Sequence, residues 1–124
     1  KEVSRFQDIP LSPDKDAYLH LEDSGMLRCF TVRAENGLLV GYAVFLVSHS
    51  LHFSGSLQAN QDVLFIHPEH RGRGHEFIAW CDEQLKVEKV QLVYQHVTLA
   101  HDFSPMLKKL GYEHVEQIHV RRLD

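Results

Sequence analysis

The hydrophobic residues of the chain fall into short runs whose spacing predicts the order of strands and helices. Two runs rich in β-branched and aromatic residues, 26–34 and 38–47, flank the triplet Glu-Asn-Gly. An Asn-Gly pair between two such runs is a strong signal for a β-hairpin. The second run is apolar at nearly every position, which is typical of a strand buried on both faces in the middle of a sheet.

A predicted helix precedes this hairpin, and a loop and a third strand follow it. Ser12 serves as N-cap of the helix, Pro13 fits its first position, and Gly25 supplies its stop. Residues 48–60 are polar and interrupted by glycine and serine, which predicts a loop with room for a strand end. The apolar run 61–68 then predicts a short buried strand that ends in proline.

The second half of the chain alternates helices and strands. Apolar residues recur at helical spacing between residues 75 and 89, which predicts an amphipathic helix. Its apolar face consists of Phe77, Ile78, Cys81 and Leu85. Further patterns predict a strand over 90–97, a short helix over 103–111 and a last strand over 113–123. A hairpin followed by strand–helix units implies a mixed sheet with helices on its faces.

The composition fits a single globular domain over residues 1–124. Hydrophobic residues make up 44% and charged residues 24%, the proportions of a chain that buries a real core. The net charge of -4 disfavours nucleic-acid binding, which needs a basic surface. No apolar run is long enough to span a membrane, so we expect neither nucleic acid nor membrane as a partner.

The two cysteines and the first residue bear on where the protein works. Cys29 and Cys81 have no metal-type spacing and are too few for a disulfide framework, so we expect a reducing, cytoplasmic compartment. No signal-peptide pattern opens the chain. Because it begins at Lys1 rather than methionine, we expect a trimmed piece that lacks N-terminal residues.

The segment IHPEHRGRGHEF, residues 66–77, joins a predicted strand to a predicted helix. A helix N-terminus has unpaired N–H groups and a partial positive charge, so it attracts phosphate. Gly72 and Gly74 let the backbone approach an anion closely. Arg71 and Arg73 can add charge-assisted hydrogen bonds. The alternative is a plain strand-to-helix connection with solvated arginines.

This segment resembles motif A of the GNAT superfamily of acyl-CoA-dependent N-acyltransferases, a hydrophobic residue and a proline followed by R-x-x-G-x-G/A. The matching residues are Ile66, Pro68, Arg71, Gly72 and Gly74. The resemblance covers about residues 26 to 124, through FSPMLKKLGYE, which is similar to the family's closing Y-x-x-x-G-F/Y segment. It implies an α/β (α+β) fold with a mixed, mostly antiparallel central sheet, helices on both faces, and N-terminal elements missing.

The resemblance also implies a binding site for acetyl-CoA, or another acyl-CoA, as co-substrate, and no metal. In the family the pyrophosphate sits on the motif-A turn. The pantetheine pairs with the end of the preceding strand, in a gap where two central parallel strands splay apart. The implied cofactor-binding residues are Phe65, Ile66, Arg71, Gly72, Arg73, Gly74 and His75. Backbone N–H groups near Ile66 would polarise the thioester carbonyl.

Two residues depart from the family pattern. Glu76 stands where the motif has glycine or alanine; its carboxylate suits the helix dipole but repels a pyrophosphate unless it points outward. Leu107 stands where many members carry a tyrosine that protonates the leaving thiolate. A second hypothesis is therefore a GNAT-fold binding or regulatory module that has lost catalysis and retains coenzyme A affinity.

Acylation of an amine needs a base, and two residues are candidates. Asp62 begins the strand that leads to motif A, where the family often has an acidic residue, and His96 ends the following strand. The alternative roles are a loop cap for Asp62 and packing at a strand end for His96. His101 and Asp102 lie where the family's strand–helix loop meets the cofactor, and Asp102 can instead cap the short helix.

The ten histidines raise a third hypothesis, a metal site. His49 and His52 are three residues apart, as are His67 and His70. Zinc needs three or four convergent ligands, and no thiolate or carboxylate set accompanies either pair, so we favour surface or core histidines. The leading hypothesis is an N-acetyltransferase acting on a primary amine of a small molecule or peptide, with a homodimer left open.

Overall fold

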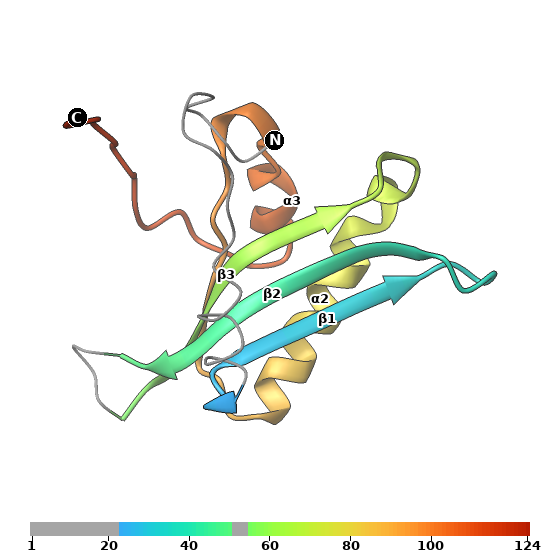
Figure 1. Cartoon of the computed structure of the whole chain (residues 1–124), viewed down its shortest axis with the longest axis horizontal. Coiled ribbons are helices and arrows are strands. Elements are labelled where there is room, and N and C mark those ends of the chain that lie inside the picture. Colours follow the sequence, from blue (N-terminus) through green and yellow to red (C-terminus); the bar gives the residue numbers. More distant parts are fainter. Residues whose placement is uncertain (1–22, 51–54) are drawn as a thin grey trace.

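The computed structural model describes residues 23–50 and 55–124 (Figure 1). The predicted first helix therefore lies almost entirely outside the described residues. Its last part is visible: Asp23 is helical, and Gly25, the predicted stop, has a left-handed φ of 78°.

Four strands form one sheet in the order β1-β2-β3-β4 (Figure 1). The strands are β1 (Leu27–Arg33), β2 (Leu39–His49), β3 (Leu57–Ile66) and β4 (Leu92–Tyr94). The β1–β2 and β2–β3 pairs are antiparallel, and the β3–β4 pair is parallel. The predicted class, a mixed and mostly antiparallel sheet with helices, is confirmed.

The predicted hairpin is present. Gly37 N–H donates to Ala34 O at 2.9 Å, which closes the turn between β1 and β2. Gly37 has a φ of 88°, a conformation that glycine adopts without the clash a Cβ would cause. β2 lies between β1 and β3, as its apolar pattern predicts.

Strand β3 begins earlier than the sequence indicates. Residues 48–60 are predicted as a loop, but β2 continues to His49 and β3 starts at Leu57. The reason is that polar residues alternate with Leu57 and Ala59, and Ala59 is fully buried. A strand needs apolar residues on its buried face only, so this half-polar stretch still pairs.

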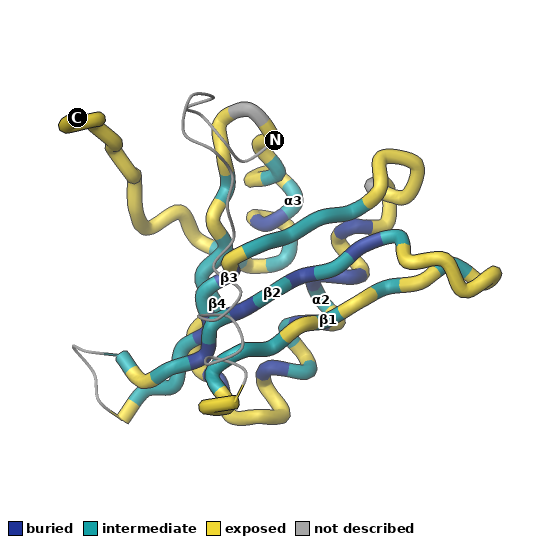
Figure 2. Tube along the Cα trace, in the orientation of Figure 1, coloured by how far each residue is buried: buried dark blue, intermediate teal, exposed yellow. Residues whose placement is uncertain are grey.

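Helix α2 (Gly74–Val87) covers one face of the sheet (Figure 1). The predicted apolar face is confirmed, because Phe77, Cys81 and Leu85 pack in one core cluster with residues of β2 and β3. The sheet residues of that cluster are Ala43, Phe45, Val47 and Ala59. Figure 2 shows the buried positions along β2 and α2. Burial raises the pKa of the Cys81 thiol to about 12.

Two shorter elements follow, and the last predicted strand does not form. Helix α3 (Ser104–Lys109) agrees with the prediction, and β4 covers only the centre of the predicted strand 90–97. The predicted strand over 113–123 is wrong: this segment has no strand structure, and all its residues are exposed (Figure 2). Alternating apolar residues make a strand only where a neighbouring strand pairs with them, and in the part of the chain that the structure describes none does.

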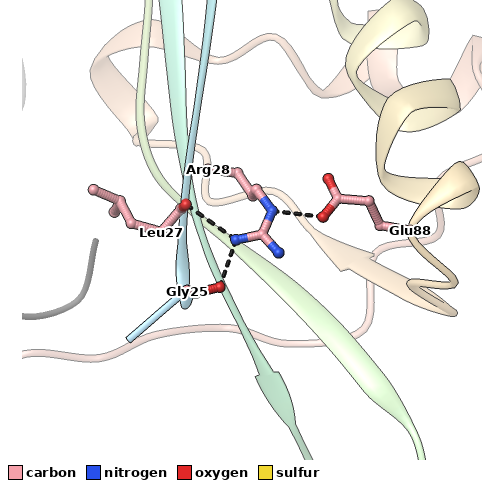
Figure 3. Close-up of polar contacts among 4 residues, drawn as sticks. All are labelled: Gly25, Leu27, Arg28 and Glu88. Carbon is pink, nitrogen blue, oxygen red and sulfur yellow. Dashed lines mark hydrogen bonds and ion pairs between the residues drawn. The ribbon is translucent and has the colours of Figure 1, made fainter. Parts of the chain in front are cut away.

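Arg28 ties the beginning of β1 to the end of α2 (Figure 3). Its Nε donates to Glu88 Oε1 at 2.7 Å, and its Nη1 donates to the carbonyl oxygens of Gly25 and Leu27. The guanidinium thus joins the strand that opens the described sheet to the helix that covers it.

Candidate functional site

A 3-10 turn leads from β3 into α2. The turn η1 covers Pro68–Arg73, and Arg73 is the N-cap residue of α2. No side chain caps this helix start with a hydrogen bond. The 3-10 turn runs directly into the helix, so its carbonyl groups accept from N–H groups at the junction, while the positive end of the α2 dipole still favours an anion here.

The two motif glycines have different physical roles. A Cβ placed on Gly72 would meet no atom of the described chain within 4 Å. A Cβ placed on Gly74 would come within 3.0 Å of the Ile66 Cδ1 atom and 3.8 Å of Met106. Gly74 is therefore closely packed, because an added Cβ would crowd the terminal methyl of Ile66, whereas a Cβ on Gly72 would meet no such neighbour. From the sequence alone, both glycines are predicted to let the backbone approach an anion.

Glu76 forms an ion pair within the turn. The Arg73 Nε atom lies 2.7 Å from Glu76 Oε2, and the two side chains are 80% and 51% exposed. An exposed pair of this kind contributes little to stability. Its consequence is local: the carboxylate that departs from the family pattern neutralises one of the turn's own cations. Arg71 lies on the same 3-10 turn.

The histidines of the turn lie at its surface. His75 is exposed in the first turn of α2. The rings of His67 and His70 are 6.0 Å apart, and His67 Nδ1 accepts from the Glu69 N–H at 3.2 Å. Among the described residues, no three His, Cys, Asp or Glu side chains converge as metal ligands would. His52 lies outside the described residues.

Strands β3 and β4 separate after a short stretch of pairing, as the resemblance implies. Their paired residues are Gln58 with Leu92, Ala59 with Val93, and Asn60 with Tyr94. Beyond this point β3 continues to Ile66 alongside β2, whereas the chain after Tyr94 is no longer a strand. We call the point of separation, at Gln61 and Gln95, the fork. Phe65 and Ile66, both half-buried, lie at the other end of β3, next to the turn.

Both candidate bases lie at the fork. Val44 pairs with Val63 and Phe45 pairs with Gln61, so Asp62 is the extra residue of a β-bulge. Asp62 is exposed, and so is His96. Gln61 is 8% exposed, and its Oε1 accepts from the His96 N–H at 2.8 Å. The structure thus places Asp62 and the backbone of His96 at the end of β3–β4 pairing, whereas the sequence predicts Asp62 near the start of its strand.

Gln61 is a residue that the sequence analysis missed. It shares its face of β3 with Ala59, which belongs to the core cluster under α2. A glutamine at an inward position of an otherwise apolar strand was the available signal, because buried amides need hydrogen-bond partners.

Helix α3 completes the surroundings of the turn. Leu107 is 7% exposed, so the position of the family's tyrosine is filled by a core residue. The Tyr112 hydroxyl donates to both carboxylate oxygens of Asp82, at 2.7 and 2.8 Å. Burial and the bond to Asp82 raise the pKa of Tyr112, and burial raises the pKa of Asp82. This phenol is tied to α2.

Asp102 is not the N-cap residue of α3: that residue is Phe103, which has no side-chain capping hydrogen bond, and Asp102 forms a turn just before it. Asp102 Oδ1 accepts from the Ser104 N–H at 2.9 Å, and hydrogen bonds from the Ser104 side chain first and its backbone second lower the pKa of Asp102. His101 lies exposed at the end of the 3-10 turn η2 (Leu99–His101).

No protein-family model matches the sequence, and no curated protein matches it. Solved structures do match the fold. A transcriptional regulator from Bacillus halodurans C-125 matches with a TM-score of 0.72 and 16% identity, over 87% of this chain and 73% of that chain. An acetyltransferase from Trypanosoma brucei matches with a TM-score of 0.69 and 18% identity, over 95% and 84%. The chain has the GNAT fold.

A third structure with the GNAT fold shows a ligand. AAC(6')-Iy in complex with the bisubstrate analogue CoA-S-monomethyl-acetylneamine matches with a TM-score of 0.66 and 19% identity, over 90% of this chain and 81% of that chain. Identities this low establish the fold alone. Within residues 23–50 and 55–124, no helix is long and apolar enough to cross a membrane.

Proposed function

We propose that this GNAT-fold chain is an N-acetyltransferase that transfers an acyl group from acetyl-CoA to a primary amine. The observation that carries the proposal is the match to acetyltransferase folds together with the contact-free Gly72 on the turn that leads into α2. The start of α2 is joined by the turn η1 to β3, the strand that separates from β4. The turn, β3 and the fork form one continuous path.

The path has the dimensions of an extended ligand. The backbone N–H groups at the start of α2, with Gly72 beside them, would hold the pyrophosphate. From Ile66 back to Gln61, a strand rises about 16 Å, and this edge of β3 would guide the pantetheine arm. The thioester then falls at the fork. This differs from the sequence-based expectation, which placed the polarised carbonyl near Ile66.

Bound acetyl-CoA supplies an activated acyl group, and the chain supplies positioning and proton removal. Asp62, exposed on the bulge, is the proposed base that takes the proton from the ammonium of the substrate. His96 is the alternative base at the same place. Because Leu107 is buried and carries no acid, solvent delivers the proton to the leaving sulfur.

Ligand binding is tested by thermal unfolding with and without acetyl-CoA and coenzyme A. Ligand that binds the folded chain raises its apparent stability by about 2.7 kcal/mol at a hundred times Kd. We expect this stabilisation in the wild type and its loss in Gly72→Val. The matched control is Gly55→Val, because a Cβ on Gly55 also meets nothing within 4 Å but lies far from the turn. No stabilisation of the wild type by either ligand would overturn the proposal.

The base is tested by Asp62→Asn. We expect kcat to fall by roughly a hundredfold, the scale of general-base catalysis, with little change in coenzyme A affinity. Asparagine keeps the size of the side chain and removes its basicity. A fully active variant would move the role to His96 or to solvent.

The second candidate function is a coenzyme A-binding regulatory module. Buried Leu107 favours it, and one matched structure is that of a transcriptional regulator.

The acetyltransferase proposal has its own support in the matched structures. The bisubstrate analogue in the matched AAC(6')-Iy structure joins CoA to an acetylneamine, which supports CoA as the acyl carrier and a small-molecule amine as acceptor. A wild type that binds coenzyme A but acetylates no aminoglycoside, polyamine, peptide N-terminus or lysine peptide would decide for the module.

A further inference from the structure

Gln61 occupies an unusual position for a glutamine. Its side chain is buried on the face of β3 that packs under α2. Burying an amide is unfavourable unless its polar atoms are hydrogen-bonded. Here Oε1 accepts from the backbone N–H of His96 at 2.8 Å. A side chain thus takes the place of the backbone acceptor that the next residue pair of a parallel ladder would use.

The hydrogen bond lies at the end of β3–β4 pairing. Asn60 with Tyr94 is the last pair, Gln61 is the next residue of β3, and Asp62 follows as the bulge. A fork displaced by a single residue would move by about 3.3 Å along the strand. It would also turn the side chains that follow to the opposite face of the sheet.

We propose that Gln61 is a positioning residue that fixes the point where β3 and β4 part, and with it the part of the site that receives the pantetheine and thioester. The inference rests on the proposed function. Gln61 would not contact the nucleotide portion of the ligand, because that portion would bind at the turn, at the other end of β3.

The test removes the acceptor and keeps the length of the side chain, in Gln61→Met. The matched control is Gln58→Met, the same change on the same strand where β3 and β4 are still paired. Two probes are titrated by calorimetry: acetyl-CoA, which spans the turn and the fork, and 3′-phospho-ADP, which covers the turn alone. Amide hydrogen exchange at His96 reports the hydrogen bond directly.

We expect Gln61→Met to weaken acetyl-CoA binding by about tenfold, the scale of a lost buried hydrogen bond. Affinity for 3′-phospho-ADP should change by less than about twofold, because the turn is distant from the substitution. Exchange at His96 should become faster in Gln61→Met and stay unchanged in Gln58→Met. A merely structural role would weaken both probes together.

The possible failures are distinguishable. A wild type that binds neither probe overturns the proposed function and this inference with it. A wild type that binds acetyl-CoA while Gln61→Met binds it equally well overturns the inference alone, as does an equal loss for both probes. If Gln61→Met does not fold, Gln61→Asn keeps the amide but shortens its reach, and the same separation of the two probes is expected.

Discussion

The two ends of helix α2 are built in opposite ways. At the last turn the backbone closes on itself: the Lys89 N–H donates to Lys86 O at 2.9 Å. The Val90 N–H donates to Leu85 O at 3.1 Å. With Lys89 in the left-handed region at a φ of 70°, this is a Schellman motif, which satisfies the last carbonyl groups of a helix.

The first turn has no such closure. Arg73 is an N-cap residue without a capping hydrogen bond from a side chain, and beside it Gly72 borders open space. Every helix leaves four N–H groups at its start and four carbonyls at its end. Here the chain satisfies its own carbonyl end and anchors it to β1 through Arg28 and Glu88 (Figure 3). At the N–H end no side chain forms a capping hydrogen bond, and the 3-10 turn η1 leads directly into the helix.

Of the substitutions that test the difference between the two ends of α2, Gly74→Val is expected to change the stability most. Its Cβ would come within 3.0 Å of Ile66 Cδ1, so that methyl group must shift by a few tenths of an ångström, and the two further methyl groups of valine add to the crowding. We expect a loss of about 1–3 kcal/mol in the free energy of unfolding, the scale of overpacking, measured by urea denaturation. Gly72→Val is the control and should stay within about 0.5 kcal/mol of the wild type. Equal destabilisation by both variants would contradict the division between a packing glycine and a ligand-facing glycine.

The closed end can be improved. Lys89→Gly removes the strain of a left-handed residue with a Cβ, and we expect a gain of about 0.5–1 kcal/mol in the free energy of unfolding. The reverse change is available at the end of α3, where Gly111 has a φ of 95° in the same arrangement; Gly111→Ala should destabilise. Lys89→Ala separates the backbone effect from the lost charge, because it should be nearly neutral. A destabilised Lys89→Gly would show that the lysine side chain supports this end.

The smallest expected effect is a change in coenzyme A affinity when the charges at the first turn of α2 are altered. Glu76→Gln releases Arg73 from its ion pair, and we expect coenzyme A to bind about threefold tighter at low salt. The gain should disappear at high salt, because both side chains are exposed and screened. Calorimetric titration at two ionic strengths measures it, with Arg73→Met in the same background as control. Weaker binding in Glu76→Gln would instead mean that Glu76 holds the guanidinium toward the anion.

Local signals explain what the sequence predicts well. The hairpin follows from Asn36 and Gly37, and α2 follows from an apolar repeat on one face. Helix spacing and turn chemistry are properties of neighbouring residues, so they can be read along the chain. The prediction of where β3 begins is wrong for the opposite reason. Whether Gln58 belongs to a loop or to a strand depends on the residues that pair with it across the sheet.

The site is harder to predict because its contacts are distant in sequence. Gln61 and His96 are separated by 35 residues, and no local pattern announces their hydrogen bond. The motif specifies glycine at position 74 and leaves position 72 open, and only the structure shows that the Ile66 side chain packs against Gly74. Segment 113–123 has the alternating pattern of a strand but is not a strand in the structure. The pattern gives a segment an apolar face, but a strand also needs a neighbouring strand to pair with.

The open space beside Gly72 has a consequence for how the sequence can drift. Selection for folding alone does not restrict position 72, since any side chain there projects away from the described chain. The same selection disfavours larger side chains at position 74, where a Cβ would crowd the Ile66 methyl group. Descendants that keep the fold but abandon the ligand should therefore lose Gly72 early and retain Gly74. Among related chains, a glycine at position 72 becomes a marker of retained ligand binding, whereas a glycine at position 74 also reflects packing.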